Sequence, residues 1–190
     1  MKLRTLLLLA LLAITPARAA SPTPSASPTP DELWAETQKA LSQNDHGRVL
    51  PQLQTLANGG HVKAMLELAQ MYRAGNGVKG NWKTAQEWYE KAAAAGHSEA
   101  YWLIGQLYLD GGPELEKNWA TAKDWLEKAA PALPEAYWLI GDLYYEGGPG
   151  LARDVAKSCA YFERAVGART AWELGPDCPA PANPDSKAQP

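Results

Sequence analysis

The chain of 190 residues is poor in the side chains that most often hold metals or carry out catalysis. It contains two cysteines, three histidines and one phenylalanine. The histidines are scattered and both cysteines come late, so no zinc-ligand spacing occurs. No phosphate-binding glycine loop and no Gly-x-Ser-x-Gly motif is present. The sequence therefore predicts no metal and no cofactor, and we expect a protein that is not an enzyme.

The chain also lacks an apolar run of the roughly 20 residues needed to span a bilayer. Its longest candidate, residues 6–14, has nine residues and follows a basic N-terminus. The Ala-Arg-Ala at 17–19 fits a signal-peptidase site. We therefore expect residues 1–20 to be a secretory signal peptide and the protein to be periplasmic or secreted in a bacterium. No stable membrane insertion is expected after signal cleavage.

Positive charge is scarce once the signal peptide is removed. The whole chain has a net charge of −3. Residues 1–20 hold three of the 18 basic side chains and none of the 21 acidic ones, which leaves 15 bases, 21 acids and a net charge of −6. Nucleic acids and anionic membrane surfaces bind basic patches, so the charge disfavours both as partners.

What the chain does have is an internal repeat. Residues 99–105, Glu-Ala-Tyr-Trp-Leu-Ile-Gly, recur letter for letter at 135–141. The same offset of 36 residues aligns alanines at 64, 100 and 136, tyrosines at 72, 108 and 144, and glycines at 75, 111 and 147. A period of this length indicates stacked structural repeats.

Each repeat reads as two helices joined by a glycine loop. Apolar residues recur at three- and four-residue spacing over 100–108, which predicts a first helix, helix A. Asn81, Asn118 and Asp154 suit the N-cap of a second helix, helix B, because their side chains accept hydrogen bonds from free backbone N–H groups. Gly105 and Gly141 predict points where helices approach closely, since glycine has no side chain to separate them.

Residues 64–75 follow the spacing Ala-x-x-x-x-Gly-x-x-Tyr-x-x-Gly with alanine at the first glycine position, and residues 77–93 read Gly-Val-x-x-Asn-x-x-x-Ala-x-x-Trp-Tyr-x-Lys-Ala-Ala. This pattern resembles the Sel1-like repeat, a relative of the tetratricopeptide repeat. The resemblance implies an all-α, right-handed α/α superhelix (solenoid) of about four helix-turn-helix repeats. Three departures are Ala69 in place of glycine, Val155 in place of an aromatic residue, and Gly-Gly-Pro in the second and third loops.

The expected organisation is a solenoid over residues 31–175. Its units are a divergent N-terminal cap at 31–63, repeats at 64–99, 100–135 and 136–170, and a truncated cap at 171–175. Thr29 and Glu32 match a capping box at the start of the first helix, whereas Pro51 leaves the start of the second helix open. Residues 21–30 read as a Pro/Ser/Thr-rich linker and residues 176–190 as a proline-rich disordered tail.

The histidines and cysteines have mainly structural interpretations. His61 and His97 share one repeat column, which favours a capping role, and His46 is assigned to a loop. An oxidising compartment favours a disulfide between Cys159, on the last helix B, and Cys178. Two free thiols are the alternative, because the other residues in the column of Cys159 are polar and suggest an exposed position.

In solenoids of the resembled type, helix A lines the concave face. Carried over to this chain, the resemblance implies a partner-binding surface made of Leu66, Gln70, Arg73, Trp102, Gln106, Leu109, Trp138, Asp142 and Tyr145. Trp102 and Trp138 hold the same place in consecutive repeats, and tryptophan is typical of binding surfaces. The same pattern also fits tryptophans packed in the core, and both interpretations remain open.

The expected function is an exported, non-enzymatic scaffold that binds a peptide or partner domain in its concave groove. It would act as an adaptor or as an effector-immunity protein, a role that some exported relatives have. The alternative is recognition or hydrolysis of cell-wall glycan (peptidoglycan), with aromatic rings stacking on sugars. Hydrolysis would need a pair of carboxylates, and Asp110 with Asp142 is the candidate pair.

Overall fold

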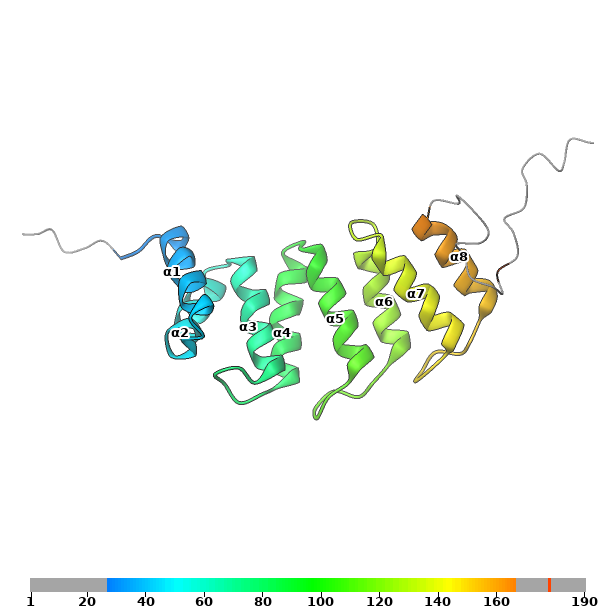
Figure 1. Ribbon diagram of the computed structural model, residues 1–190, viewed down its shortest axis with the longest axis horizontal. Coiled ribbons are helices and arrows are strands. Elements are labelled where there is room, and N and C mark those ends of the chain that lie inside the picture. The colour runs from blue at the N-terminus through cyan, green and yellow to red at the C-terminus, as the bar shows by residue number, and fades with distance from the viewer. Residues whose placement is uncertain (1–26, 167–177, 179–190) are drawn as a thin grey trace, which may run out of the picture.

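The computed structural model describes residues 27–166 and Cys178. The predicted signal peptide, most of the predicted linker, the truncated cap at 171–175 and the tail apart from Cys178 lie outside the described residues. In the described part, β-type pairing is limited to two isolated bridges. Within the described residues, eight helices form a row (Figure 1): α1 (Pro30–Ser42), α2 (His46–Asn58), α3 (Val62–Ala74), α4 (Trp82–Ala94), α5 (Ser98–Asp110), α6 (Trp119–Ala129), α7 (Glu135–Glu146) and α8 (Val155–Val166).

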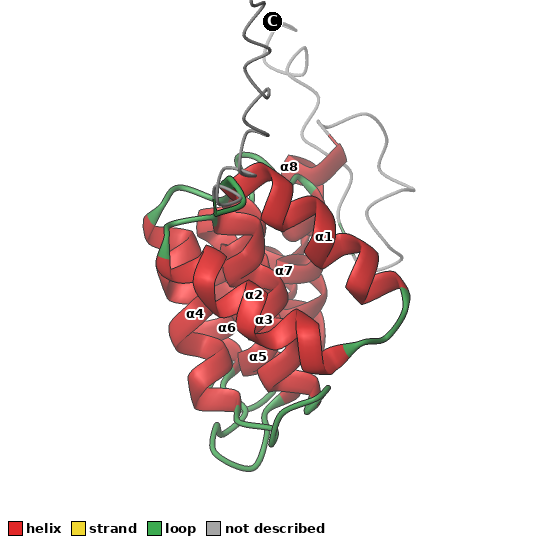
Figure 2. Ribbon diagram, turned by 90° about the vertical axis from the view of Figure 1, so that its left-hand side faces the viewer, coloured by secondary structure: helices red, strands yellow, loops and turns green. Residues whose placement is uncertain are grey.

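The helices form an all-α superhelix of four pairs, as predicted. Each helix packs mainly on its neighbours along the chain. We call α1, α3, α5 and α7 the A layer, and α2, α4, α6 and α8 the B layer. Viewed along the row, α4 and α6 lie toward one side and α1 and α7 toward the other (Figure 2). The A helices of the three repeats begin one or two residues before the predicted unit boundaries at 64, 100 and 136.

The core lies between the two layers. Leu68, Ile104 and Ile140 of the A layer are fully buried, as are Tyr89 and Leu126 of the B layer. One repeat buries little apolar surface alone, so stacking its neighbours completes the core. None of the described helices is long and apolar enough to cross a membrane.

The predicted helix caps are confirmed. The Thr29 side chain accepts the Glu32 N–H at 3.3 Å, and the Glu32 carboxylate accepts the Thr29 N–H at 2.8 Å, which completes the capping box. The side chains of Asn81, Asn118 and Asp154 each accept an N–H three residues on, at 2.8, 2.9 and 3.0 Å. Each cap satisfies a backbone donor that the first helical turn leaves free.

His46 is not in a loop, as the sequence suggested, but is the first residue of α2, with Asp45 as its N-cap. Its side chain fills the space beside Gly77, where an added Cβ would lie 2.4 Å from the His46 Cβ. Pro51 lies inside α2 and does not end the helix.

Trp82 and Trp119, the first residues of α4 and α6, each pack against a glycine in the loop of the following repeat, as His46 does. An added Cβ at Gly112 would lie 2.3 Å from the Trp82 ring, and one at Gly148 would lie 2.4 Å from the Trp119 ring. Each tryptophan therefore requires a glycine in the loop of the following repeat. This contact explains why the second and third loops carry a second glycine.

The two helix glycines lie where the layers approach closely, as predicted. A Cβ at Gly105 would be 2.9 Å from Leu126 Cγ, and a Cβ at Gly141 would be 2.4 Å from Phe162 Cε1. Real Cβ atoms do not come this close to other atoms, so a larger residue would force the helices apart.

Cys159 of α8 and Cys178 form a disulfide, with their Cα atoms 5.4 Å apart. Cys159 is only 4 % exposed, so the exposed position suggested by its repeat column was wrong. Its side chain is bonded to Cys178, whereas the equivalent positions in the earlier repeats hold the partly exposed Gln86 and Lys123.

Candidate functional site

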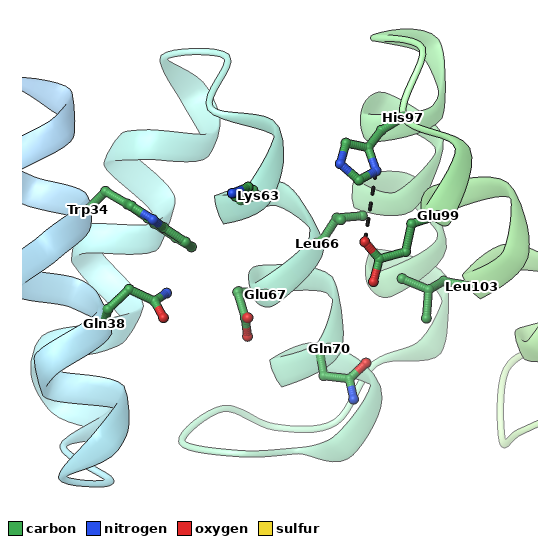
Figure 3. Close-up of a pocket in the computed structure, with 9 residues that line it drawn as sticks. All are labelled: Trp34, Gln38, Lys63, Leu66, Glu67, Gln70, His97, Glu99 and Leu103. Atoms are coloured by element: carbon green, nitrogen blue, oxygen red, sulfur yellow. Dashed lines mark ion pairs between the residues drawn. The ribbon is translucent and has the colours of Figure 1, made fainter. Parts of the chain in front are cut away.

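The A layer carries a hollow of about 580 Å³ across its first three helices, which we call the groove hollow (Figure 3). The lining residues come from α1, from α3 and from the first part of α5 together with its N-cap: Trp34, Gln38, Lys63, Leu66, Glu67, Gln70, His97, Glu99 and Leu103. The hollow therefore lies on the face where the resemblance placed the concave surface.

Trp34 forms one wall of the groove hollow, and the helix caps hold it in place. Its ring packs on the imidazole of His61, with ring centroids 4.6 Å apart. His61 Nδ1 accepts the Ala64 N–H at 3.2 Å, which confirms its predicted capping role. His97 holds the same position before α5 but makes no capping hydrogen bond; its Nδ1 lies 4.0 Å from Glu99 Oε2 instead (Figure 3).

Two carboxylates make the groove hollow electronegative. Burial raises the pKa of Glu67, and the nearby charge of Glu99 raises it further. Tyr89 lies behind them and donates its hydroxyl hydrogen to Gln70 Oε1 at 2.9 Å. Burial raises the pKa of Tyr89 to about 12; Arg73 opposes this shift, while Glu67 and Glu99 add to it.

A smaller hollow of about 330 Å³ lies between α5 and α7, and we call it the apolar hollow. Glu99, Trp102, Leu133 and Glu135 line it. Glu99 borders both hollows, so they are neighbours on the A-layer face. Together they offer apolar surface flanked by carboxylates, which suits binding better than bond-breaking chemistry.

The predicted surface residues divide into those that reach a hollow and those that do not. Leu66 and Gln70 line the groove hollow, and Trp102 lines the apolar hollow. Trp138 is 36 % exposed, yet its ring packs on Phe162 with centroids 5.0 Å apart. Trp102 likewise packs partly against the core, so each interpretation of the tryptophans describes part of their surroundings.

Gln106 and Asp142 occupy the same column of consecutive A helices. Gln106 is half-buried, whereas Asp142 is exposed. Burial raises the pKa of Asp142, and the charge of Glu146 one turn along α7 raises it further. The column therefore changes from a neutral amide in α5 to an acidic side chain in α7.

Three predicted residues lie beside the loops, in the last turns of their helices, rather than in either hollow. Arg73 pairs with Asp110 at 2.7 Å, Leu109 packs against the hydrophobic cluster of α6 and α7, and the Tyr145 ring lies 5.2 Å from the Arg153 guanidinium.

Trp34 and Leu103 line the groove hollow but were not among the residues predicted for the binding surface. The connection from α1 to α2 is shorter than the one from α3 to α4, so the first unit does not follow the 36-residue offset. Aligning the N-caps Thr29 and His61 instead places Trp34 in the column of Leu66 and Trp102. That signal was present in the sequence.

The two carboxylates of the candidate hydrolytic pair stand on different A helices and have different surroundings. The Asp110 carboxylate is bound by Arg73 of α3, whereas Asp142 belongs to α7, on the other side of α5 (Figure 1). Within the described residues, no group of three or more His, Cys, Asp or Glu side chains could hold a metal ion.

The Sel1 repeat model matches residues 62–97, 98–130 and 134–166. The chain belongs to the Sel1 repeat family. The three matched Sel1 repeats correspond to the pairs α3–α4, α5–α6 and α7–α8, and the unmatched pair α1–α2 is the divergent cap. Sel1 repeats are generally non-enzymatic protein-interaction scaffolds.

Solved Sel1 structures share this fold. The protective antigen c5321 of uropathogenic Escherichia coli is 34 % identical, with a TM-score of 0.54 over 62 % of this chain and 25 % of that one. A Sel1 repeat protein from Oxalobacter formigenes is 23 % identical, with a TM-score of 0.57 over 73 % of this chain and 58 % of that one. The chain thus spans about a quarter and somewhat over half of their lengths. No curated protein matches the chain significantly.

Proposed function

We propose that the protein is an exported, non-enzymatic scaffold that binds a protein or peptide partner on its A-layer face. The observation that supports this most directly is the groove hollow, which α1, α3 and α5 build jointly. A binding face shared by several repeats suits an extended ligand, because each repeat adds one segment of contact. The neighbouring apolar hollow adds the tryptophan that protein interfaces favour.

The test uses the mature chain as bait in a periplasmic extract, followed by titration of the identified, purified partner. The variant, called the groove variant after the predicted concave groove, is Trp102→Ala/Trp138→Ala, which changes the apolar hollow and the matching position of α7. The control is Lys83→Ala/Glu87→Ala on α4 of the B layer. We expect affinity to fall at least about tenfold in the groove variant and to stay unchanged in the control, since buried tryptophans dominate binding energy. Circular dichroism establishes that both variants fold. Binding that only the α4 variant weakens would contradict the proposal.

Export is tested separately. The full chain is expressed in a Gram-negative host, the cells are fractionated, and the N-terminus of the product is sequenced. We expect a periplasmic or secreted product that begins at Ala20 or Ser21, because the Ala-Arg-Ala motif ends at Ala19. A cytoplasmic product that keeps Met1 would contradict export and leave the binding proposal to its own test.

A role as an effector-immunity protein belongs to the same proposal. It would require that the captured partner be a toxic effector and that the bound chain neutralise it. Co-expression of the identified partner with the chain, or with its groove variant, tests this directly. Protection from toxicity by the wild-type chain alone is the expected result, and toxicity unchanged by the wild-type chain would limit the function to that of an adaptor.

A further inference from the structure

The two layers of the superhelix carry opposite net charge. The four A helices contain nine acidic and three basic side chains, a net charge of −6. The four B helices contain five acidic and seven basic side chains, a net charge of +2. The negative charge of the chain is therefore concentrated on the layer that holds both hollows.

The carboxylates that line the two hollows have no lysine or arginine as an ion-pair partner among the described residues. Among the described residues, no ion pair involves Glu67 or Glu135, and Glu99 lies at 4.0 Å from a histidine. Burial raises the pKa of Glu67, and the charge of Glu99 adds to that shift. Lys63 also lines the groove hollow, so with histidine neutral the lining residues keep a net charge of −1. A cation placed between the two carboxylates would relieve their repulsion.

Aromatic and aliphatic side chains stand beside these charges. Trp34 projects from α1 toward α3, and Leu66 lies beyond it (Figure 3). The face of a tryptophan ring attracts an ammonium or guanidinium group, and the apolar stem of lysine or arginine packs on leucine. Next to Glu99, Trp102 and Leu133 give the apolar hollow a surface on which an aliphatic or aromatic side chain can pack.

We infer that the partner presents an extended basic segment to the A layer, with an arginine or lysine between Glu67 and Glu99 beside Trp34, and an apolar side chain in the apolar hollow. This inference rests on the proposed function and names the chemistry of the ligand. Charge-assisted hydrogen bonds from a guanidinium to the carboxylates would fix the register of the segment. Acidic peptides would be repelled by the same face.

The test selects binders to the mature wild-type chain from a displayed library of random 12-residue peptides. The enriched peptides are synthesised with a fluorophore and titrated by anisotropy at low and high salt. The variants are Glu67→Gln/Glu99→Gln in the groove hollow and Trp102→Ala in the apolar hollow. The control, Glu87→Gln/Glu116→Gln, removes two exposed carboxylates that lie outside both hollows.

We expect the enriched peptides to pair arginine or lysine with an apolar residue. Their affinity should fall at least about tenfold in Glu67→Gln/Glu99→Gln, fall with added salt, and stay unchanged in the control. A different outcome would be peptides that are not basic, that bind Trp102→Ala less tightly and that bind Glu67→Gln/Glu99→Gln as tightly as the wild type. Such peptides would overturn this inference while supporting the proposed function. Peptides insensitive to every A-layer substitution, or no binder at all, would count against both.

Discussion

The A and B layers of the superhelix come from the same repeat but use their charged residues differently. In the B layer, several charged side chains are paired within the molecule. Lys123 contacts Asp124 at 2.7 Å and Glu127 at 3.2 Å, and Tyr161 of the next B helix donates a hydrogen bond to Glu127. In the A layer, the ion pair between helices is Arg73–Asp110, at the loop end of the face.

Aromatic contacts repeat this difference. Lys91 lies 3.7 Å from the ring centroid of Trp88, and Lys128 lies 3.9 Å from that of Trp125, at equivalent positions of α4 and α6. Each cation covers a half-buried ring that would otherwise face water. These lysines of the B layer stabilise contacts within the molecule, whereas the carboxylates in the A-layer hollows remain available to a partner.

The largest expected effect concerns the end of the B layer, where a disulfide joins α8 to Cys178. Cys159→Ala/Cys178→Ala should lower the free energy of unfolding by about 3 kcal/mol, because the bridge closes a loop of 19 residues in the unfolded chain. Urea denaturation of wild type and variant, each with and without reductant, measures this. Reductant should bring the wild type to the stability of the variant; a variant as stable as the oxidised wild type would contradict the prediction.

The next effect concerns the contact between the layers. Gly141→Ala should cost about 2 kcal/mol, because its Cβ would lie 2.4 Å from the stiff Phe162 ring. Gly105→Ala is the matched variant one repeat earlier, where the nearest atom is 2.9 Å away on the more adaptable Leu126 side chain. Thermal unfolding should show the larger loss for Gly141→Ala. Equal losses would mean that the helices separate as easily at both sites.

The sequence predicted most of the fold because the fold is periodic. A seven-residue identity fixed the repeat offset, and the columns of Asn81 and Gly105 then placed the caps and the close contacts. Asp45 lies 36 residues before Asn81 and caps α2 in the same way. The predicted series of N-caps started at Asn81 and therefore left Asp45 out.

The candidate site was predicted less completely, because its members break the repeat pattern. Trp34 was missed since the first unit is shorter, and Glu67 stands where the two later repeats have leucine. Periodicity identifies what the repeats share, whereas a site for one partner depends on where they differ. The ion pair of Arg73 with Asp110 joins two different repeat columns, so no single column could reveal it.

A smaller effect should come from breaking the internal charge pairing of the B layer. Burial opposes the charge of Lys123, but hydrogen bonds to Asp124 and Glu127 outweigh it and raise the pKa of Lys123. Its side chain is 17 % exposed, whereas those of Asp124 and Glu127 are 65 % and 38 % exposed. Lys123→Met therefore removes the cation that the two carboxylates share and leaves Glu127 with the hydrogen bond from Tyr161 alone. We expect a loss of about 1 kcal/mol in urea denaturation. Lys83→Met, at an exposed position of α4, is the control and should change little.

The smallest effect should have the opposite sign and lies in the A layer. Because the folded structure raises the pKa of Glu67, its protonated form favours folding, and this contribution is lost as pH rises through the folded pKa. Glu67→Gln should therefore stabilise the fold at pH 7 by less than about 1 kcal/mol, since solvent screens a partly exposed charge. The gain should vanish at pH 3, where wild-type Glu67 is protonated in both states. Thermal melts at both pH values measure it, with Glu87→Gln as the B-layer control. A loss of stability at pH 7 would show that Glu67 already has a cationic partner, and the contrast between the layers would then fail at the groove hollow.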